Sequence, residues 1–202
     1  KLAELANAAV MVGYGDTRVL VCATAAAVPV TALISSPCLW TSKRRCMLWA
    51  ASPAPSTVVR AVPAERHPDI PCHRRPIRPL FPSDFRNDVS IMATVMSVDH
   101  DCSPEIAALI GTSAALAISD IPWNGPVGAL KVGLVNGELI LNPNSEQRQV
   151  SDLDVTVVST GKKVVMIEAG ANEVDNDTMF RAIKLAHEEN QKQIDLINRM
   201  VA

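Results

Sequence analysis

A helix signal that is apolar on nearly every side restricts the fold of this chain more than any other feature. Ser103 supplies an N-cap, Pro104 the first helical position and Glu105 an early acid, so the sequence predicts a helix that runs to about Ser119. Its body, IAALIGTSAALAIS, has no polar side to face water. The run is too short, and too broken by glycine and hydroxyl residues, for a membrane span. We therefore expect a helix packed closely against a β-sheet.

Strand signals on both sides of this helix supply such a sheet. Alternating or β-branched runs bounded by Gly, Asn and Ser indicate short strands. The strongest signal is a hairpin around Asn136-Gly137, a dipeptide that suits a two-residue turn. The last pair of strands, around Thr160-Gly161, is apolar enough to suggest burial. The predicted strands are 9–12, 18–24, 91–98, 129–135, 138–141, 152–159 and 163–168.

A charged helix is predicted from about Asn176 to the end of the chain. Its apolar residues form a stripe along one side, at the spacing of an amphipathic helix. The residues of the stripe are Met179, Ile183, Ala186, Ile194 and Ile197. The helix has no stop signal, and the chain starts at Lys1, without methionine, in sequence that is already patterned. We therefore expect a piece of a longer protein.

Charge and cysteine content exclude several classes of protein. A net charge of -2 over 202 residues gives no global reason to bind nucleic acid, so such binding needs a local cluster of arginines. The five cysteines are odd in number and contain no Cys-x-x-Cys pair, which disfavours a disulfide framework and a zinc site. No apolar run reaches the ~20 residues of a membrane span, and no signal peptide precedes the first strand. We expect a cytoplasmic protein that does not enter a membrane.

Two arginines in the stretch RPIRPLFP form the local cluster that the charge argument requires. Arg75 and Arg78 are three residues apart, and each is followed by proline, which fixes φ. The pattern predicts a stiff, non-helical frame that could hold both guanidinium groups against phosphate oxygens. A Pro-rich loop with two solvated charges is the other interpretation, and the spacing alone leaves it open.

Five stretches of the chain together resemble one family. In chain order they are GDTRVLVCATA, RPIRPLFPSDFRNDV, SPEIAALIGTSAALAISDIPWNGPVGALKVGLVNGELILNP, SDLDVTVVSTGKKVVMIEAGANEV and AHEENQKQI. The sequence is similar to the first core domain of bacterial polynucleotide phosphorylase. This resemblance implies the ribonuclease PH fold, an α+β fold in which a mixed β-sheet packs with helices. The last helix would then begin an all-helical region.

The resemblance also implies an activity and its partners. The family degrades single-stranded RNA from the 3′ end, with inorganic phosphate as co-substrate, nucleoside diphosphates as products and Mg²⁺ as cofactor. Its members form homotrimeric rings and join RNA-degradation complexes. Their catalytic and magnesium-binding residues lie in a second core, so none is carried onto this chain. Arg75 and Arg78 are carried over as RNA- or phosphate-binding residues, because they match the RPIRPLFP motif of the family.

The resemblance predicts a first ribonuclease PH-like core at 1–170 and the start of a helical linker at 171–202. Three functions stay open. The chain is a fragment of polynucleotide phosphorylase, or a non-catalytic RNA-binding or assembly subunit of an exosome-like ring, or a stand-alone ribonuclease PH-type exonuclease. Under the first, preferred interpretation, the fragment supplies ring scaffold and part of the RNA path and is inactive alone.

Residues 30–74 interrupt the resemblance, which resumes intact at Arg75. The segment has two acids against six Lys and Arg, six scattered prolines and no hydrophobic period. When it is back-translated with free choice of synonymous codons and read out of register, it yields family-like sequence. That sequence contains Gly-Ser-Phe-Tyr-Arg-Arg, an arginine-bearing loop that narrows the RNA channel in the family. We hypothesise compensating single-base insertions or deletions, and we expect the segment to fold poorly.

One run of metal-ligand residue types needs a separate interpretation. Asp99-His100-Asp101-Cys102 precedes the apolar helix. Consecutive loop residues cannot all converge on one ion. We therefore favour a solvated turn at this point.

Overall fold

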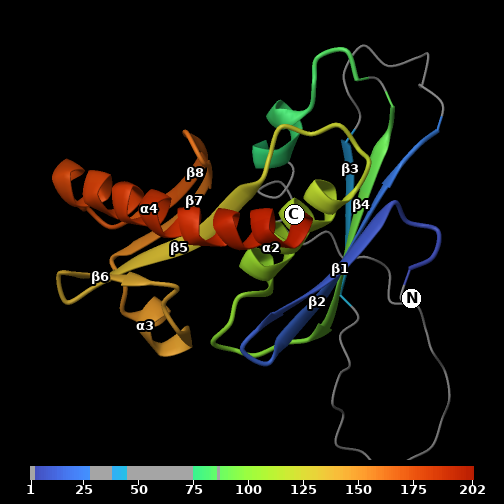
Figure 1. The fold of residues 1–202 in the computed structure, drawn as a ribbon. Helices are drawn as coiled ribbons and strands as arrows, with labels where there is room; N and C mark the ends of the chain where they lie inside the picture. The colour runs from blue at the N-terminus through green and yellow to red at the C-terminus, as the bar shows by residue number, and fades with distance from the viewer. Residues whose placement is uncertain (1–2, 28–37, 45–74, 86) are drawn as a thin grey trace, which may run out of the picture.

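Two four-stranded sheets, each with a long helix against it, form the part of the chain that the computed structural model describes (Figure 1). That part comprises residues 3–27, 38–44, 75–85 and 87–202. The first sheet, in the order β1-β2-β4-β3, contains β1 (Ala8–Tyr14), β2 (Thr17–Ala25), β3 (Cys38–Arg44) and β4 (Val89–Ser97). The second, in the order β6-β5-β7-β8, contains β5 (Val127–Val135), β6 (Glu138–Leu141), β7 (Leu153–Thr160) and β8 (Val164–Ala171). The helical elements are the 3-10 turn η1 (Arg78–Leu80), α2 (Pro104–Ile118), α3 (Ser145–Gln149) and α4 (Asn176–Val201).

The first sheet is mixed, as the resemblance implies. Strands β1 and β2 form a hairpin, in which Gly15 takes the positive φ of 56° that the turn requires. Strand β4 runs antiparallel to β2 and parallel to β3. Alternate residues of β2 and β4 are buried, which gives the sheet one apolar face. These residues are Val19, Val21, Ala23, Val89, Ile91, Ala93 and Val95.

Helix α2 is covered by both sheets, which accounts for its apolar composition. It contacts β1 and β2 of the first sheet as well as β5 and α4 of the second half. Gly111 permits the close approach to β2, because a Cβ at this position would lie 2.7 Å from Cγ2 of Val21. The helix begins at Pro104 as predicted, although the side chain of its N-cap, Ser103, makes no capping hydrogen bond.

The second sheet confirms the Asn-Gly hairpin and corrects one expectation. Asn136 and Gly137 have φ angles of 52° and 82°, which a tight turn between β5 and β6 requires. Strand β7 is buried at its centre, as expected. The predicted burial of its partner β8 holds for Met166 and in part for Val164, whereas every residue from Ile167 to Ala171 is exposed. In the described part of the sheet β8 is the last strand, and α4 packs on β5 and β7 instead.

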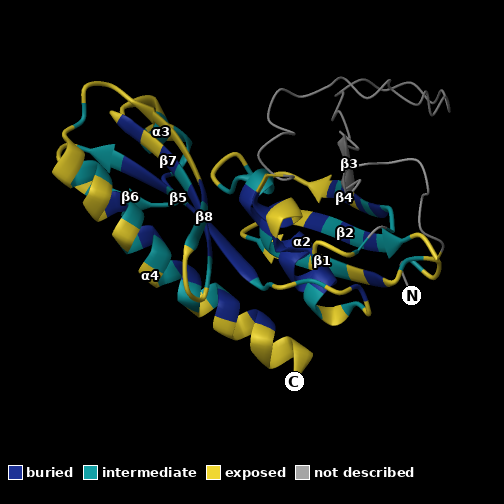
Figure 2. Cartoon of the chain, turned by 90° about the horizontal axis from the view of Figure 1, so that it is seen from above, coloured by how far each residue is buried: buried dark blue, intermediate teal, exposed yellow. Residues whose placement is uncertain are grey.

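Helix α4 packs one narrow stripe against the second sheet and α2, and most of its other side chains are exposed or partly exposed (Figure 2). The carboxylate of Asp175 caps its first turn by accepting hydrogen bonds from the backbone N–H groups of Asp177 and Thr178. Among the predicted stripe residues, Met179 and Ile183 are only partly buried. The buried positions are Ala182, Ala186, Asn190, Ile194 and Ile197.

The segment 30–74 contributes one described element. Residues 38–44 form β3 and pair in parallel with 89–95 of β4. The expectation that the segment folds poorly otherwise lies outside the described residues.

Candidate nucleic-acid interface

The two arginines predicted to contact RNA lie on consecutive helical turns. Residues 75–77 are α-helical, and η1 follows directly from Arg78. The predicted non-helical frame is therefore wrong, although proline supplies the fixed φ as expected. Pro79 lies at the start of its turn, where a helix needs no N–H donor and where a φ near -65° fits. The local preference of a pre-proline residue for extended backbone is overridden by burial of the neighbouring residues.

Burial separates the cationic and apolar residues of this segment into two sets. Arg75 and Arg78 are exposed, and helical spacing places residues three apart on one side. Ile77 is fully buried, and Pro76 is buried beside it. Leu80 and Phe81, each 8% exposed, also belong to the core. The segment thus anchors itself by apolar side chains and turns two guanidinium groups toward solvent, an arrangement that suits contacts to phosphate.

A loop distant in sequence supports this arginine-bearing turn, and sequence reasoning missed it. The indole Nε1 of Trp123 donates a hydrogen bond to the carbonyl oxygen of Ile77 at 3.4 Å. The backbone N–H of Asn124 donates to the carbonyl oxygen of Leu80 at 2.9 Å. The stacked rings of Phe81 and Phe85, with centroids 6.0 Å apart, continue the apolar base. The only local signal for this support is the aromatic residue in the Pro-Trp-Asn-Gly stretch after α2.

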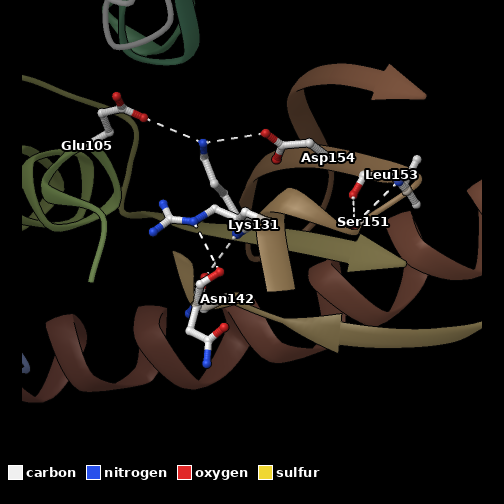
Figure 3. A network of polar contacts seen from close by, with 8 residues as sticks. Glu105, Lys131, Asn142, Ser151, Leu153 and Asp154 are labelled. Atoms are coloured by element: carbon white, nitrogen blue, oxygen red, sulfur yellow. Dashed lines mark hydrogen bonds and ion pairs between the residues drawn. The ribbon is translucent and has the colours of Figure 1, made fainter. Parts of the chain in front are cut away.

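A second polar cluster joins α2 to the second sheet (Figure 3). The Nζ of Lys131, on β5, lies 3.6 Å from a carboxylate oxygen of Glu105 on α2 and 3.8 Å from one of Asp154 on β7. The backbone N–H of Lys131 donates to the side-chain oxygen of Asn142 at 3.1 Å. With a side chain only 19% exposed, Lys131 pairs with two carboxylates and acts as a structural junction.

Beside this junction lies a shallow hollow open to solvent. Among its lining residues are Tyr14, Asp101, Ser103, Lys131, Asn142 and Arg148. Burial raises the pKa of the Tyr14 phenol. Hydrogen bonds from the backbone N–H and hydroxyl of Ser145 lower the pKa of the exposed Asp101 carboxylate. The run 99–102 thus forms a turn in which Asp101 is engaged by α3, and among the described residues no three His, Cys, Asp or Glu side chains gather as a metal site.

The fold and the match to two family models define the class of protein. Residues 1–122 match the model of domain 1 of the 3′ exoribonuclease family, and residues 125–189 match domain 2. The division falls at Trp123 and Asn124, between the first sheet with α2 and the second sheet with α4. The chain belongs to the 3′ exoribonuclease family.

Within that family, bacterial polyribonucleotide nucleotidyltransferases are similar to this chain along its whole length. The enzyme of Ruminiclostridium cellulolyticum is 48% identical over 204 residues, which cover 100% of this chain and 29% of that protein. The enzyme of Halothermothrix orenii is 47% identical over 197 residues, covering 96% of this chain and 28% of that protein. The resemblance to bacterial polynucleotide phosphorylase is thereby confirmed. The chain spans less than a third of the length of these relatives.

A solved structure confirms the fold class. The crystal structure of rice (Oryza sativa) Rrp46 superposes with a TM-score of 0.79 and covers 100% of this chain and 92% of that chain. The sequence identity is 15%, so this likeness concerns the fold alone. The predicted α+β, ribonuclease PH-like architecture with a terminal helix is confirmed.

Proposed function

We propose that this chain is the first core of a phosphorolytic 3′-to-5′ exoribonuclease. The observation that carries the proposal is the 48% identity, along the whole chain, to a polyribonucleotide nucleotidyltransferase. In the proposed reaction an oxygen of inorganic phosphate attacks the phosphorus of the 3′-terminal linkage of single-stranded RNA. The bond from that phosphorus to the 3′ oxygen of the preceding nucleotide breaks, and a nucleoside diphosphate leaves.

In this proposal the chain supplies ring scaffold and part of the RNA path. Arg75 and Arg78 bind backbone phosphates, because they are exposed, always charged and fixed by a buried base. Such contacts position RNA without reading its sequence. The whole protein forms a homotrimer, works in the cytoplasm and joins other RNA-degrading proteins. Residues 171–202, most of which form α4, are the start of a helical linker.

The catalytic and metal-binding residues are assigned to another part of the whole protein. The described residues hold no cluster that fits Mg²⁺, and the resemblance places catalytic and metal-binding groups in a second core. None of the helices in the described ranges has the length and apolarity to cross a bilayer. We expect the isolated 202-residue chain to release no nucleoside diphosphate from poly(A) and phosphate. Release would favour a stand-alone exonuclease and would contradict the assignment of this chain as an inactive fragment.

The RNA-binding role is tested in the full-length protein with Arg75 and Arg78 replaced by Ala. Each phosphate contact to a single strand contributes about 0.7 to the slope of log affinity against log salt, so the double replacement should lower the slope by about 1.4. The measurement is the anisotropy of fluorescein-labelled oligo(A) at several salt concentrations.

The matched control removes two exposed arginines from α4, Arg181 and Arg199. Replacing both by Ala changes the net charge equally and should leave the slope within error of the parent. An unchanged slope in the Arg75 and Arg78 variant would refute the RNA-binding assignment.

We also propose that residues 30–74 arose from compensating shifts of the reading frame. The alignment with the relative from Ruminiclostridium cellulolyticum supports this, because 204 aligned positions accommodate all 202 residues with almost no change of length. Sequencing the coding DNA from Ala27 to Arg78 decides the matter. A clean read that encodes the residues as printed, with no alternative frame resembling the relatives, would overturn the proposal.

A further inference from the structure

The loop between α2 and β5 brackets Arg78 with two hydrogen bonds. Trp123 donates to the carbonyl of Ile77, the residue before Arg78. Asn124 donates to the carbonyl of Leu80, two residues after it. Both bonds fix backbone atoms of the turn, so the loop sets the direction in which the arginine leaves the protein surface.

The indole of Trp123 is itself held in place. A Cβ at Gly125 would overlap the six-membered ring, so the ring lies directly against the glycine backbone. The side chain is half-buried and packs on the apolar cluster that contains Ile77, Leu80 and Phe81. Because the side chain packs on the core and donates its N–H to the turn, it holds the arginine-bearing turn in a fixed position relative to the core.

We propose that Trp123 is a positioning residue for RNA binding by Arg75 and Arg78. This inference rests on the proposed RNA-binding function of the two arginines. Trp123 acts through the backbone of residues 77–80, and its own contact is with protein. Loss of the indole frees the turn, so that both guanidinium groups lose their fixed geometry and the RNA backbone is bound less tightly.

A double-mutant cycle in the full-length protein tests the proposal. We expect Trp123→Ala to raise the Kd for fluorescein-labelled oligo(A) about fivefold, which is within the range of coupling between neighbouring residues. The KM for poly(A) should rise by the same factor, while kcat and the KM for phosphate stay unchanged. Trp123→Phe keeps an aromatic ring beside Gly125 but lacks the Nε1–H that donates to the carbonyl of Ile77, so it should recover only part of the lost affinity.

The decisive arm repeats Trp123→Ala in a protein that already lacks both arginines. With no guanidinium group left to position, the substitution should now change Kd less than twofold. A further fivefold loss in that background would overturn the proposal in favour of direct stacking of Trp123 on RNA bases. An unchanged Kd for Trp123→Ala in the parent would overturn it as well.

Two controls separate this inference from general destabilisation and from the function on which it rests. Leu130→Ala creates a cavity in the apolar cluster of the second sheet, where the side chain is 5% exposed, and should leave Kd unchanged. The Arg75 and Arg78 replacement measured alone reports on the RNA-binding role. If the replacement of Arg75 and Arg78 weakens RNA binding while Trp123→Ala does not, the proposed function stands and the positioning role of Trp123 fails. If it leaves binding unchanged, both fail.

Discussion

Helices α2 and α4 each accompany a four-stranded sheet, yet they differ in nearly every property. In α2, ten of 15 residues are buried, and the helix contacts both halves of the molecule. In α4, five of 26 residues are buried, and the exposed remainder is mostly charged or polar (Figure 2). The comparison teaches that the composition of a helix follows from how many of its sides are covered. It does not follow from the kind of sheet beside it.

Replacing one leucine of each helix by alanine should give the largest difference between the helices in the free energy of unfolding. Leu109 on α2 is 1% exposed and Leu196 on α4 is 51% exposed. Leu109→Ala leaves a cavity between packed layers and should lower the free energy of unfolding by about 3 kcal/mol. Leu196→Ala should change it by less than about 0.5 kcal/mol. Urea unfolding of the chain followed by circular dichroism measures both, and equal losses would break the comparison.

A smaller effect is expected where α4 buries a polar group. The side-chain N–H₂ of Asn190 donates to the carbonyl oxygen of Val157 at 3.2 Å and to the hydroxyl of Ser159 at 3.0 Å. Asn190→Ala leaves two buried acceptors without this donor and should cost about 1 to 3 kcal/mol. Asn198→Ala, on the exposed side of the same helix, makes the identical change of helix propensity and is the control. Urea midpoints that coincide for the two variants would show that the buried amide contributes nothing to stability.

The smallest expected effect on stability is the loss of a helix N-cap, for which Asp175 on α4 and Ser103 on α2 can be compared. The hydrogen bond from the backbone N–H of Thr178 lowers the pKa of Asp175 from its ordinary value of 3.8. The carboxylate therefore stabilises α4 above pH 3.8, and this contribution is lost as the pH falls through the lowered pKa. Asp175→Ala should reduce the urea midpoint at pH 7 and have no effect at the acid end of the titration.

On α2 the corresponding change should matter less. Ser103 makes no side-chain capping bond, so Ser103→Ala removes no such contact from the helix. Its urea midpoint should follow that of the parent at every pH between 3 and 7. A loss at pH 7 as large as that of Asp175→Ala would contradict this difference between the caps.

Local patterns predicted most of the elements, because each pattern reports on neighbouring residues. The Asn136-Gly137 turn and the Pro104 start of α2 depend on backbone angles that a few residues determine. The exposure of β8 from Ile167 onward was not predicted from its composition, since burial depends on where distant α4 packs. Sequence alone shows that Ile167 is apolar, and it does not show that the residue is 48% exposed in the described chain.

In the candidate interface, too, local features were predicted from the sequence and tertiary contacts were not. Arg75 and Arg78 were selected from a short motif, and the structure places them both on the surface. Their helical geometry and the support by Trp123 were missed, because the contact between Trp123 and Ile77 spans 46 residues. Tertiary packing of this kind overrides the local preference of residues before proline, and no pattern within the motif encodes it.

The position of strand β3 in the sheet bears on the proposed shift of the reading frame. In the described sheet it has one neighbour, β4, and it pairs through backbone N–H and C=O groups that every residue except proline carries. A reading-frame shift rewrites side chains and leaves these groups in place, and residues 38–44 contain no proline. The same shift in β2 or β4 would fall on strands with two neighbours each. Under the proposed shift, the rewritten residues would thus fall on a strand that has one neighbour in the described sheet.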